Sequence, residues 1–419
     1  MSTASEVATH VPLAGQALTV TADAAVRPGT SPDPAYPTLG AATSLLHAYR
    51  TGSRFLATPT RTLLGHGTRA EVPHDDRPLP VRVAEALTAG RADGHGTPLV
   101  LGAVPFDQHA PAALAIPAEL RTGPALASDP MIALPAERPD PVDWGIRQVP
   151  EPDEYAAGVA DAVDRMWQGE FSKVVLARTL ELTAPGPLDL PGMVDRLARR
   201  DPSGYTFALP VGPGRTLLGA SPELLVSRRG TRVVANPLAG STPRGADLAE
   251  DVRRAAALLE SAKDLHEHAV VVDAVYTALA PFCRDLVVPE RPTLVRTATM
   301  WHLSSTVTAT LADPTTSALE LACALHPTPA VCGTPTALAR RVIADTEPFD
   351  RGYFTGMVGW GDADGDGEWV VTIRCAEAEA NRLRLYAGAG VVAASQPQAE
   401  TEETGAKFRT FLSAVGAEL

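Results

Sequence analysis

Hydrophobic positions recur at regular spacing most clearly in the second half of the chain. Apolar residues at helical spacing predict helices over 154–170, 247–263, 264–282, 335–348 and 399–419. Alternating or β-branched runs predict strands over 171–182, 216–245, 293–311 and 355–392. The last of these segments is expected to form two or three antiparallel strands. Because strands adjoin strands and helices adjoin helices, the order predicts a layered α+β fold with mainly antiparallel sheets flanked by helices.

The first half of the chain has weaker periodicity and more turn residues. Residues 1–40 are rich in Pro, Ala and Thr, and we expect this N-terminal segment to be partly disordered. The Pro-rich stretch 135–155 has the composition of a domain linker. Its Trp144 and Ile146 indicate instead that it lies on a surface of the fold. Length alone permits two or three domains or one large α/β unit.

Composition places the chain among globular proteins and argues against several functions. Its 419 residues are 45% hydrophobic and 20% charged, and the net charge of −13 disfavours binding to nucleic-acid phosphates. No apolar run is long enough to span a membrane, and the N-terminus lacks the pattern of a secretory signal. The four cysteines lack CxxC spacing, so we expect a cytoplasmic protein with reduced thiols.

Lysine is rare in this chain. Of 36 basic residues, only Lys173, Lys263 and Lys407 are lysines. A buried lysine can lose its proton and act as a base, whereas arginine effectively cannot. Each lysine is therefore a candidate functional residue, with chance survival in an arginine-rich sequence as the alternative.

Acidic residues in two predicted helices provide the next candidates. Glu267 lies between two histidines, and Glu400 and Glu403 are three positions apart, so they share one helix face. Two or three carboxylates from different helices suit Mg²⁺, which retains water and takes further oxygens from its substrate. By pattern alone, a solvated helix face is favoured over a metal site.

Three loop segments have both functional and ordinary interpretations. The turn PLAGST at 237–242 is either a plain tight turn or a place where backbone N–H groups hold a carboxylate. Residues 387–392 lack GxGxxG spacing, and Gly388 and Gly390 indicate close approach of the backbone to a ligand or a neighbouring strand. The acidic loop 361–369 lacks the Glu that a calcium loop needs at its twelfth position, so it predicts a polar hairpin tip.

Ten motifs occur in the order found in chorismate-utilising enzymes. They are FSKVVLAR, LLGASPELLV, NPLAGSTPRG, KDLHEHAVVVDAV, MWHLSS, ALHPTPAVCGTP, EPFDRGYFTGMVGW, GEWVVTIRCA, YAGAGVV and EETGAKF. The chain resembles this family densely over 155–415. The family includes isochorismate and salicylate synthases and the large subunits of anthranilate and aminodeoxychorismate synthases. Four motifs are most similar to siderophore-type isochorismate synthases, which feed 2,3-dihydroxybenzoate synthesis.

The resemblance implies a single domain over 41–419 and a Mg²⁺-dependent site for chorismate. It implies that Lys173 is the base that activates water and that Glu223 is the acid. The residues implied to hold Mg²⁺ are Glu267 and Glu403, with Glu400 bonding to metal-bound water. The residues implied to contact the substrate are Gly240, Ser241, His302, Arg374, Gly388 and Lys407.

The chemistry of the implied reaction accounts for the acid and the base. Water attacks C2 of chorismate as the C4 hydroxyl departs across the conjugated diene. Hydroxide is a poor leaving group and water is a weak nucleophile, so the reaction needs a proton donor and a proton acceptor. A lysine base needs a lowered pKa, and Glu223 must stay protonated, for which the motif SPELLV supplies apolar neighbours.

The resemblance also bears on the product. Ala239 stands where the aminodeoxychorismate branch typically has an attacking lysine, and Lys173 disfavours the ammonia-using anthranilate branch. A salicylate synthase, a menaquinone-pathway isochorismate synthase and a non-catalytic chorismate-binding protein remain alternatives. Lys263 precedes Glu267 by four positions, so we expect an ion pair along the helix. We expect a monomer whose partner is its small-molecule substrate.

Overall fold

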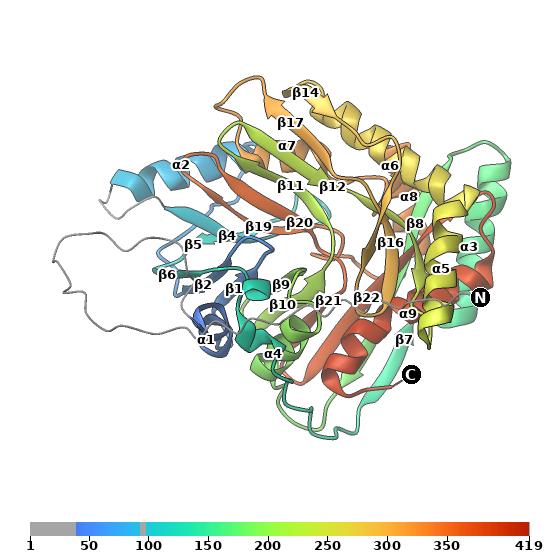
Figure 1. The fold of residues 1–419 in the computed structure, drawn as a ribbon, viewed down its shortest axis with the longest axis horizontal. Coiled ribbons are helices and arrows are strands. Elements are labelled where there is room, and N and C mark those ends of the chain that lie inside the picture. The colour runs from blue at the N-terminus through green and yellow to red at the C-terminus, as the bar shows by residue number, and fades with distance from the viewer. Residues whose placement is uncertain (1–38, 93–97, 419) are drawn as a thin grey trace, which may run out of the picture. The chain divides into compact units, whose positions relative to one another are not determined.

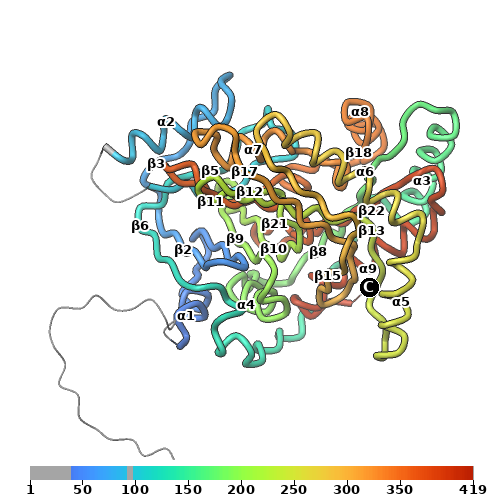
Figure 2. Tube along the Cα trace, turned by 45° about the horizontal axis from the view of Figure 1, so that its top comes forward, coloured from blue at the N-terminus to red at the C-terminus, as the bar shows by residue number. Residues whose placement is uncertain are grey.

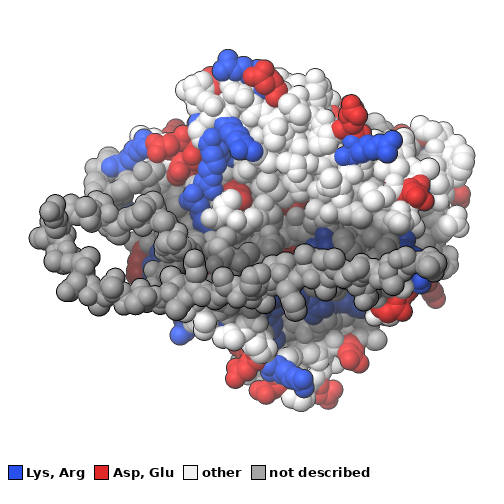
Figure 3. All heavy atoms as spheres, viewed as in Figure 1, with Lys and Arg blue, Asp and Glu red and all other residues white. Residues whose placement is uncertain are grey.

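The computed structural model describes residues 39–92 and 98–418, so the disorder expected for 1–40 lies almost wholly outside the described residues. Residues Thr38 to Leu419 form one compact unit. None of the helices within the described ranges is long and apolar enough to cross a membrane. Figure 3 shows acidic and basic side chains interspersed on the face in view.

Within the described residues, the largest sheet has ten strands (Figure 1). In spatial order they are β18 (Gly333–Thr334), β8 (Lys173–Thr183), β22 (Arg382–Val392), β21 (Cys375–Glu379), β10 (Arg215–Ser221), β9 (Tyr205–Gly212), β1 (Arg54–Ala57), β2 (Thr62–His66) and β6 (Glu119–Gly123). Strand β7 (Gly145–Val149) pairs with β8 outside this order. Neighbouring strands pair antiparallel throughout, for example β22 with β8 and β10 with β9, as the sequence predicts.

A second sheet has nine strands in the described parts of the chain. Their order is β14 (Cys283–Val287), β17 (Val307–Leu311), β12 (Arg232–Asn236), β11 (Leu224–Arg229), β20 (Gly367–Val371), β19 (Met357–Asp362), β4 (Leu99–Val104), β5 (Ala113–Ile116) and β3 (Ala70–Glu71). A smaller sheet consists of β13 (Leu238–Pro243), β16 (Met300–Ser304) and β15 (Thr293–Arg296).

The two large sheets pack against each other through one buried apolar cluster. Phe207 of β9 and Trp360 of β19 both belong to it, so side chains from both sheets fill the space between them. Burial of such large side chains supplies the main driving force for this packing. Helices cover the outer faces, and a layered α+β architecture results, as predicted (Figure 1).

Separate helices cover each outer face. The ten-stranded sheet packs against α1 (Ala41–His47), α4 (Leu190–Arg200) and α9 (Pro397–Val415), and near β8 also against α3 (Pro152–Trp167) and α8 (Thr336–Thr346). The nine-stranded sheet packs against α2 (Leu79–Ala92), α6 (Ala262–Leu279) and α7 (Ala318–Leu325). Helix α5 (Leu248–Glu260) lies beside β13 and β16. Figures 1 and 2 both show α9 beside β22.

Local sequence explains where the helices nearest the site begin and end. The Ser261 side chain accepts a hydrogen bond from the Asp264 N–H and so caps the start of α6. Pro397 occupies the first turn of α9, where a missing N–H costs nothing, and Gly416 ends that helix with φ of 69°. These caps fix the two helices that carry the predicted metal-binding carboxylates.

The Pro-rich stretch 135–155 is part of the fold surface, as predicted. Its strand β7 pairs with β8, and Trp144 and Ile146 are partly buried against the core of the ten-stranded sheet. The acidic loop 361–369 is a hairpin tip, since β19 ends at Asp362 and β20 begins at Gly367.

The prediction of two or three strands over 355–392 is wrong, because the segment forms four. Strand β20 belongs to the nine-stranded sheet, whereas β21 belongs to the ten-stranded sheet. The chain therefore crosses between sheets within residues 372–374, where Arg374 has φ of 51°. Apolar residues continue across this crossing, so the sequence pattern shows no break there.

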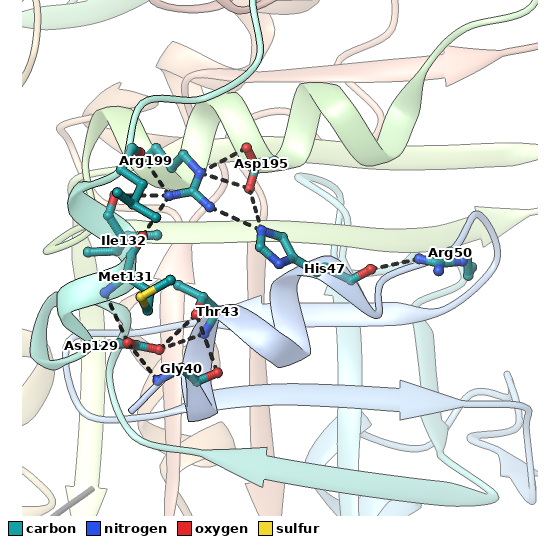
Figure 4. Close-up of polar contacts among 10 residues, drawn as sticks. Gly40, Thr43, His47, Arg50, Asp129, Met131, Ile132, Asp195 and Arg199 are labelled. Carbon is teal, nitrogen blue, oxygen red and sulfur yellow. Dashed lines mark hydrogen bonds and ion pairs between the residues drawn. The ribbon is translucent and has the colours of Figure 1, made fainter. Parts of the chain in front are cut away.

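The N-terminal helix α1 is anchored by one carboxylate (Figure 4). Asp129 accepts the N–H groups of Gly40, Ala42 and Thr43, which form the first turn of α1. Such N–H groups have no partner within the helix, so an acidic side chain satisfies both their hydrogen bonds and the helix dipole.

Candidate active site

A cavity that is partly open to solvent brings most predicted site residues together. The predicted residues that line it are Glu223, Gly240, Ser241, Glu267, His302, Arg374, Gly388, Glu403 and Lys407. The other two, Lys173 and Glu400, are each 1% exposed and lie behind this lining in ion pairs.

Lys173 begins β8 and faces a carboxylate on α6. Its Nζ lies 2.9 Å from Glu267 Oε1, and both side chains are almost fully buried. The ion pair lacks hydrogen-bond geometry, so Lys173 Nζ has no hydrogen-bond partner within the described residues. A Cβ atom at Gly390 would lie 2.3 Å from the same Glu267 oxygen, so only glycine permits this approach. The buried amino group of Lys173 therefore faces one carboxylate oxygen and keeps hydrogen-bonding capacity for a further partner.

Glu223 approaches the cavity from the other large sheet. It precedes β11, is 3% exposed, and accepts a single hydrogen bond within the described residues, from the Leu238 N–H at 3.4 Å. Burial raises the pKa of Glu223 to about 7, although the Leu238 N–H and the charges of Lys173 and Lys407 act in the opposite direction. A carboxyl group that is protonated near neutral pH is suited to act as a general acid.

The other two lysines also pair with predicted metal-binding carboxylates. Lys407 Nζ lies 2.6 Å from Glu403 Oε1 within α9, and Lys263 Nζ lies 2.9 Å from Glu400 Oε1. The predicted ion pair between Lys263 and Glu267 is therefore wrong. Glu267 faces Lys173 in the cavity, and Lys263 instead reaches from α6 to α9.

The carboxyl groups of Glu400 and Glu403 in α9 differ in how readily they ionise. Burial raises the pKa of Glu400, and Glu403 adds to the effect while Lys263 opposes it. Burial also disfavours ionisation of Glu403, but Lys407, Lys263 and a 3.1 Å hydrogen bond from Ser241 Oγ outweigh it and lower its pKa. Glu403 is thus the more readily ionised of the two.

The carboxylates that line the cavity are chemically suited to bind Mg²⁺. Glu267 and Glu403 line one cavity from two helices, and hard carboxylate oxygens are the ligands that Mg²⁺ prefers. Among residues 39–92 and 98–418, no group of three or more His, Cys, Asp or Glu side chains is arranged to hold a metal ion. Two protein carboxylates, completed by water and substrate oxygens, remain compatible with the way Mg²⁺ binds.

Arg374 and His302 form a buried polar pair in the cavity. Burial lowers the pKa of Arg374 to about 10, and among the described residues its guanidinium makes only long hydrogen bonds, 3.4 Å to His302 Nε2 and 3.5 Å to Thr410 Oγ1. Burial, together with Arg374 and Lys407, holds the pKa of His302 well below its usual range. A buried cation with such weak partners is suited to bind a carboxylate.

The predicted backbone donors lie at the cavity wall. Gly240 has φ of 78°, and a Cβ there would lie 3.0 Å from Asp264 Cβ, so the turn requires glycine. Ser241 donates its hydroxyl to Glu403, and the Gly388 carbonyl accepts a 2.8 Å hydrogen bond from Lys407 Nζ. Substrate binding by the N–H groups of these residues stays a prediction.

Sequence reasoning missed an aromatic and aliphatic wall of the cavity. Phe354 and Tyr386 stack with ring centroids 5.0 Å apart and planes 11° apart, and Val331, Thr355 and Ile373 line the space near them. These residues lie in motifs that support the family resemblance, but such side chains also fit any core. Their positions within the motifs were the one signal that could have found them.

The sequence matches the chorismate binding enzyme family over residues 132–416, which is well over half of the chain. This protein is a member of that family. The resemblance based on the ten motifs is therefore confirmed. The match begins before residue 155, where the motifs become dense.

Curated relatives in this chorismate-binding family cover nearly the whole chain. The sequence is 56% identical over 385 residues to isochorismate synthase DhbC of Bacillus subtilis, spanning 89% of this chain and 96% of that protein. It is 43% identical over 369 residues to the vibriobactin-specific isochorismate synthase of Vibrio cholerae, spanning 87% and 92%. The crystal structure of DhbC from Bacillus anthracis superposes with a TM-score of 0.84 at 47% identity, covering 90% of this chain and all of that one.

Proposed function

We propose that this protein is an isochorismate synthase that converts chorismate to isochorismate for catecholate siderophore synthesis. Relatives named isochorismate synthase match almost end to end. The observation that carries the mechanism is a buried lysine directly behind the cavity lining, paired with Glu267, and a carboxyl group with a raised pKa that lines the cavity from the other large sheet. Lys173 begins a strand of the ten-stranded sheet, and Glu223 precedes a strand of the nine-stranded sheet.

The two groups divide the proton transfers between them. Lys173 Nζ takes a proton from the water that attacks C2, and the carboxyl group of Glu223 gives its proton to the departing C4 hydroxyl. The new C–O bond at C2 and the broken C–O bond at C4 are linked by a shift of the ring double bonds. Water enters and water leaves; Lys173 then gives up the proton it gained and Glu223 regains one by exchange with solvent, so no further reactant is needed. Each proton transfer typically contributes about 10²–10⁴-fold in rate.

The polar residues of the cavity suit a doubly charged substrate. Arg374 is buried with long contacts to its neighbours, and Lys407 lies close to Glu403. We assign these cations to the two carboxylates of chorismate. His302 lines the same cavity and, with its lowered pKa, adds no charge to it.

Glu267 and Glu403 are the residues that would hold Mg²⁺. When bound, Mg²⁺ supplies positive charge that fixes a substrate carboxylate and offsets these acidic side chains. We propose this metal on the chemistry of the two carboxylates lining the cavity. Activity is expected to disappear in EDTA and to return with added Mg²⁺.

The cavity favours water as the nucleophile. Ala239 lines it and has no amine that could attack C2, while its carbonyl is bound to His268 Nδ1 at 3.1 Å. Salicylate formation by later loss of pyruvate is the second candidate, since the same acid and base would serve its first step. The names of the curated relatives favour release of isochorismate.

Product analysis tests the proposal. The purified protein is incubated with chorismate and Mg²⁺, and products are separated by chromatography with fluorescence detection. We expect isochorismate as the main product. Dominant salicylate would assign the protein to the second candidate, ammonia-dependent anthranilate would assign it to another branch, and unchanged chorismate would leave a binding protein.

Location and assembly belong to the same proposal. The four cysteines are free thiols, which is consistent with the cytoplasmic location that we propose. The monomeric state expected from the sequence stays a prediction, which sedimentation at micromolar concentration would check.

A further inference from the structure

One buried arginine contacts the cavity wall without lining the cavity. Arg351 lies in the loop between α8 and β19 and is 3% exposed. Its guanidinium lies over the ring of Phe106, which is outside the cavity, and also contacts four residues that line it. They are Val175 (carbonyl, 2.8 Å), Val331 (carbonyl, 2.8 Å), Thr355 (Oγ1, 3.1 Å) and Phe354 (ring centroid, 5.6 Å).

A glutamate one helical turn earlier completes the network. Arg351 Nε donates to Glu347 Oε2 at 2.8 Å, and one terminal nitrogen donates to Glu347 Oε1 at 2.5 Å. The same Oε1 accepts the Ala177 N–H at 2.8 Å. Because Val175 and Ala177 both belong to β8, the pair holds this strand at two points, close to Lys173 at its start.

Every hydrogen-bond donor of this guanidinium has an acceptor. An arginine side chain has five N–H groups in a rigid planar fork, and Arg351 makes five hydrogen bonds. A planar group whose donors are all used has one allowed orientation. It therefore fixes the distances among the segments that it joins.

One of those segments is held in an unusual conformation. Thr355 has φ of 59°, which is costly for a β-branched residue. Arg351 binds its hydroxyl, and His326 Nε2 lies 2.8 Å from its carbonyl. The surrounding network thus maintains a strained residue at the cavity wall, next to Phe354.

We propose that Arg351 is a positioning residue for the proposed reaction, on which this inference rests. It sets the strand of Lys173 against the segments of Val331 and Phe354, and so holds the base at a fixed distance from the substrate ring. It acts through these groups and does not touch the substrate. Misplacement of a reacting group by about 1 Å can cost about 10²-fold in rate.

A purely structural role is the alternative, and the chain contains a matched control. Arg228 is 4% exposed and donates to the carbonyls of Gly230, Asp364 and Pro314 at 2.8, 3.1 and 2.7 Å. None of those three residues lines the cavity. Removing either buried guanidinium leaves carbonyl groups without their donor; those around Arg351 belong to buried residues that line the cavity, whereas those around Arg228 belong to exposed residues outside it.

The experiment compares Arg351→Lys, Arg351→Met and Arg228→Met by thermal unfolding and by steady-state kinetics well below each melting temperature. We expect both methionine variants to melt earlier. The kcat of Arg351→Met should fall about 10²-fold and that of Arg351→Lys about 10-fold, with KM changed less than threefold. Arg228→Met should keep kcat within about twofold. The double variant Glu347→Gln/Arg351→Met removes the unpaired buried charge and should regain stability without regaining kcat.

The outcomes separate this inference from the proposed function. If wild-type protein turns over chorismate and Arg351→Met keeps a kcat similar to that of Arg228→Met, the positioning role is overturned while the proposed function stands. The positioning role is also overturned if the double variant recovers kcat together with stability. If wild-type protein forms no isochorismate, the proposed function is overturned and this inference with it.

Discussion

Asp129 and Glu223 expose equally little surface to solvent, but Glu223 lies deeper in the protein and their surroundings give them opposite charge states. Each is 3% exposed. Asp129 accepts the N–H groups of Gly40, Ala42, Thr43 and Met131 at 2.9–3.1 Å (Figure 4), whereas Glu223 accepts one long hydrogen bond. Burial disfavours the charge of both, but the donors around Asp129 outweigh it and lower its pKa, while that of Glu223 rises to about 7.

The comparison separates a structural carboxylate from the proposed general acid. Burial alone does not decide the charge of an acidic side chain, because hydrogen bonds to the ionised form can compensate the loss of water. The N-terminus of α1 offers several free N–H groups, and Asp129 uses them. Glu223 lies beside an open cavity and keeps a proton that it can give away.

The largest expected effect concerns turnover. Lys173→Ala and Glu223→Gln should each reduce kcat by about 10²–10⁴-fold, because each removes one proton transfer. Asp129→Asn is the matched control, since it neutralises a carboxylate with equally little exposed surface far from the reaction. Its kcat should stay within about twofold. Near-normal turnover of Lys173→Ala or Glu223→Gln would show that the residue is not the proposed base or acid.

The next effect concerns pH and stability. The folded-state pKa of Glu223, about 7, lies above its unfolded value, so its neutral form stabilises the fold at low pH. That contribution is lost as pH rises toward 7 and is absent above it, at a cost of about 3 kcal/mol. Glu223→Gln should therefore be more stable than wild type in urea at pH 8, with little difference at pH 4.5. Equal stability at both pH values would argue against a raised pKa.

The same pKa predicts the pH profile of catalysis. The kcat/KM of wild type should fall as pH rises through about 7, because the free enzyme then loses the proton of Glu223. A fall on the acidic side alone would indicate that Glu223 does not act as the acid.

Asp129 should matter for stability. Asp129→Ala leaves the first turn of α1 without acceptors and should lower the free energy of unfolding by about 2 kcal/mol. Because Asp129 is ionised when folded, its contribution is present at neutral pH and is lost as pH falls through its depressed pKa. Urea denaturation at pH 7 measures the difference. A loss of kcat without a loss of stability would contradict a structural role for Asp129.

The smallest expected effect concerns Mg²⁺ affinity. Lys263 binds Glu400 and also attracts Glu403, so its charge competes with a cation at the cavity. Lys263→Met should bind Mg²⁺ about three- to tenfold more tightly in calorimetry without substrate, because one nearby positive charge is removed. Lys263→Arg keeps the charge and serves as control. Weaker Mg²⁺ binding by Lys263→Met would contradict the claim that the charge of Lys263 competes with the cation.

The sequence predicted the residues of the cavity better than their pairings. The motifs correctly predicted that Glu223, Glu267 and Arg374 share one site, because each motif lies where a strand or helix meets the cavity. The partner of Lys263 was not predictable, since local helix spacing pointed to Glu267 while packing of α6 on α9 brought Glu400 closer.

The limits of the fold prediction have a similar cause. Apolar residues run almost unbroken from Trp369 to Ile373, so no local signal marks the crossing between the two large sheets. Arg351 lies in the motif EPFDRGYFTGMVGW, where no local pattern indicates that an arginine is buried, and its hydrogen bonds join segments far apart in the chain. Contacts of this kind depend on tertiary packing, which periodicity does not encode.

In the proposed mechanism, water attacks the ring of chorismate at C2 while Glu223 protonates the departing C4 hydroxyl. Turnover in water enriched with a heavy oxygen isotope, followed by mass spectrometry of the product, tests this step directly. We expect isochorismate that carries one heavy oxygen atom, located in the hydroxyl group at C2. Isochorismate without the label, or an aminated product, would contradict the mechanism.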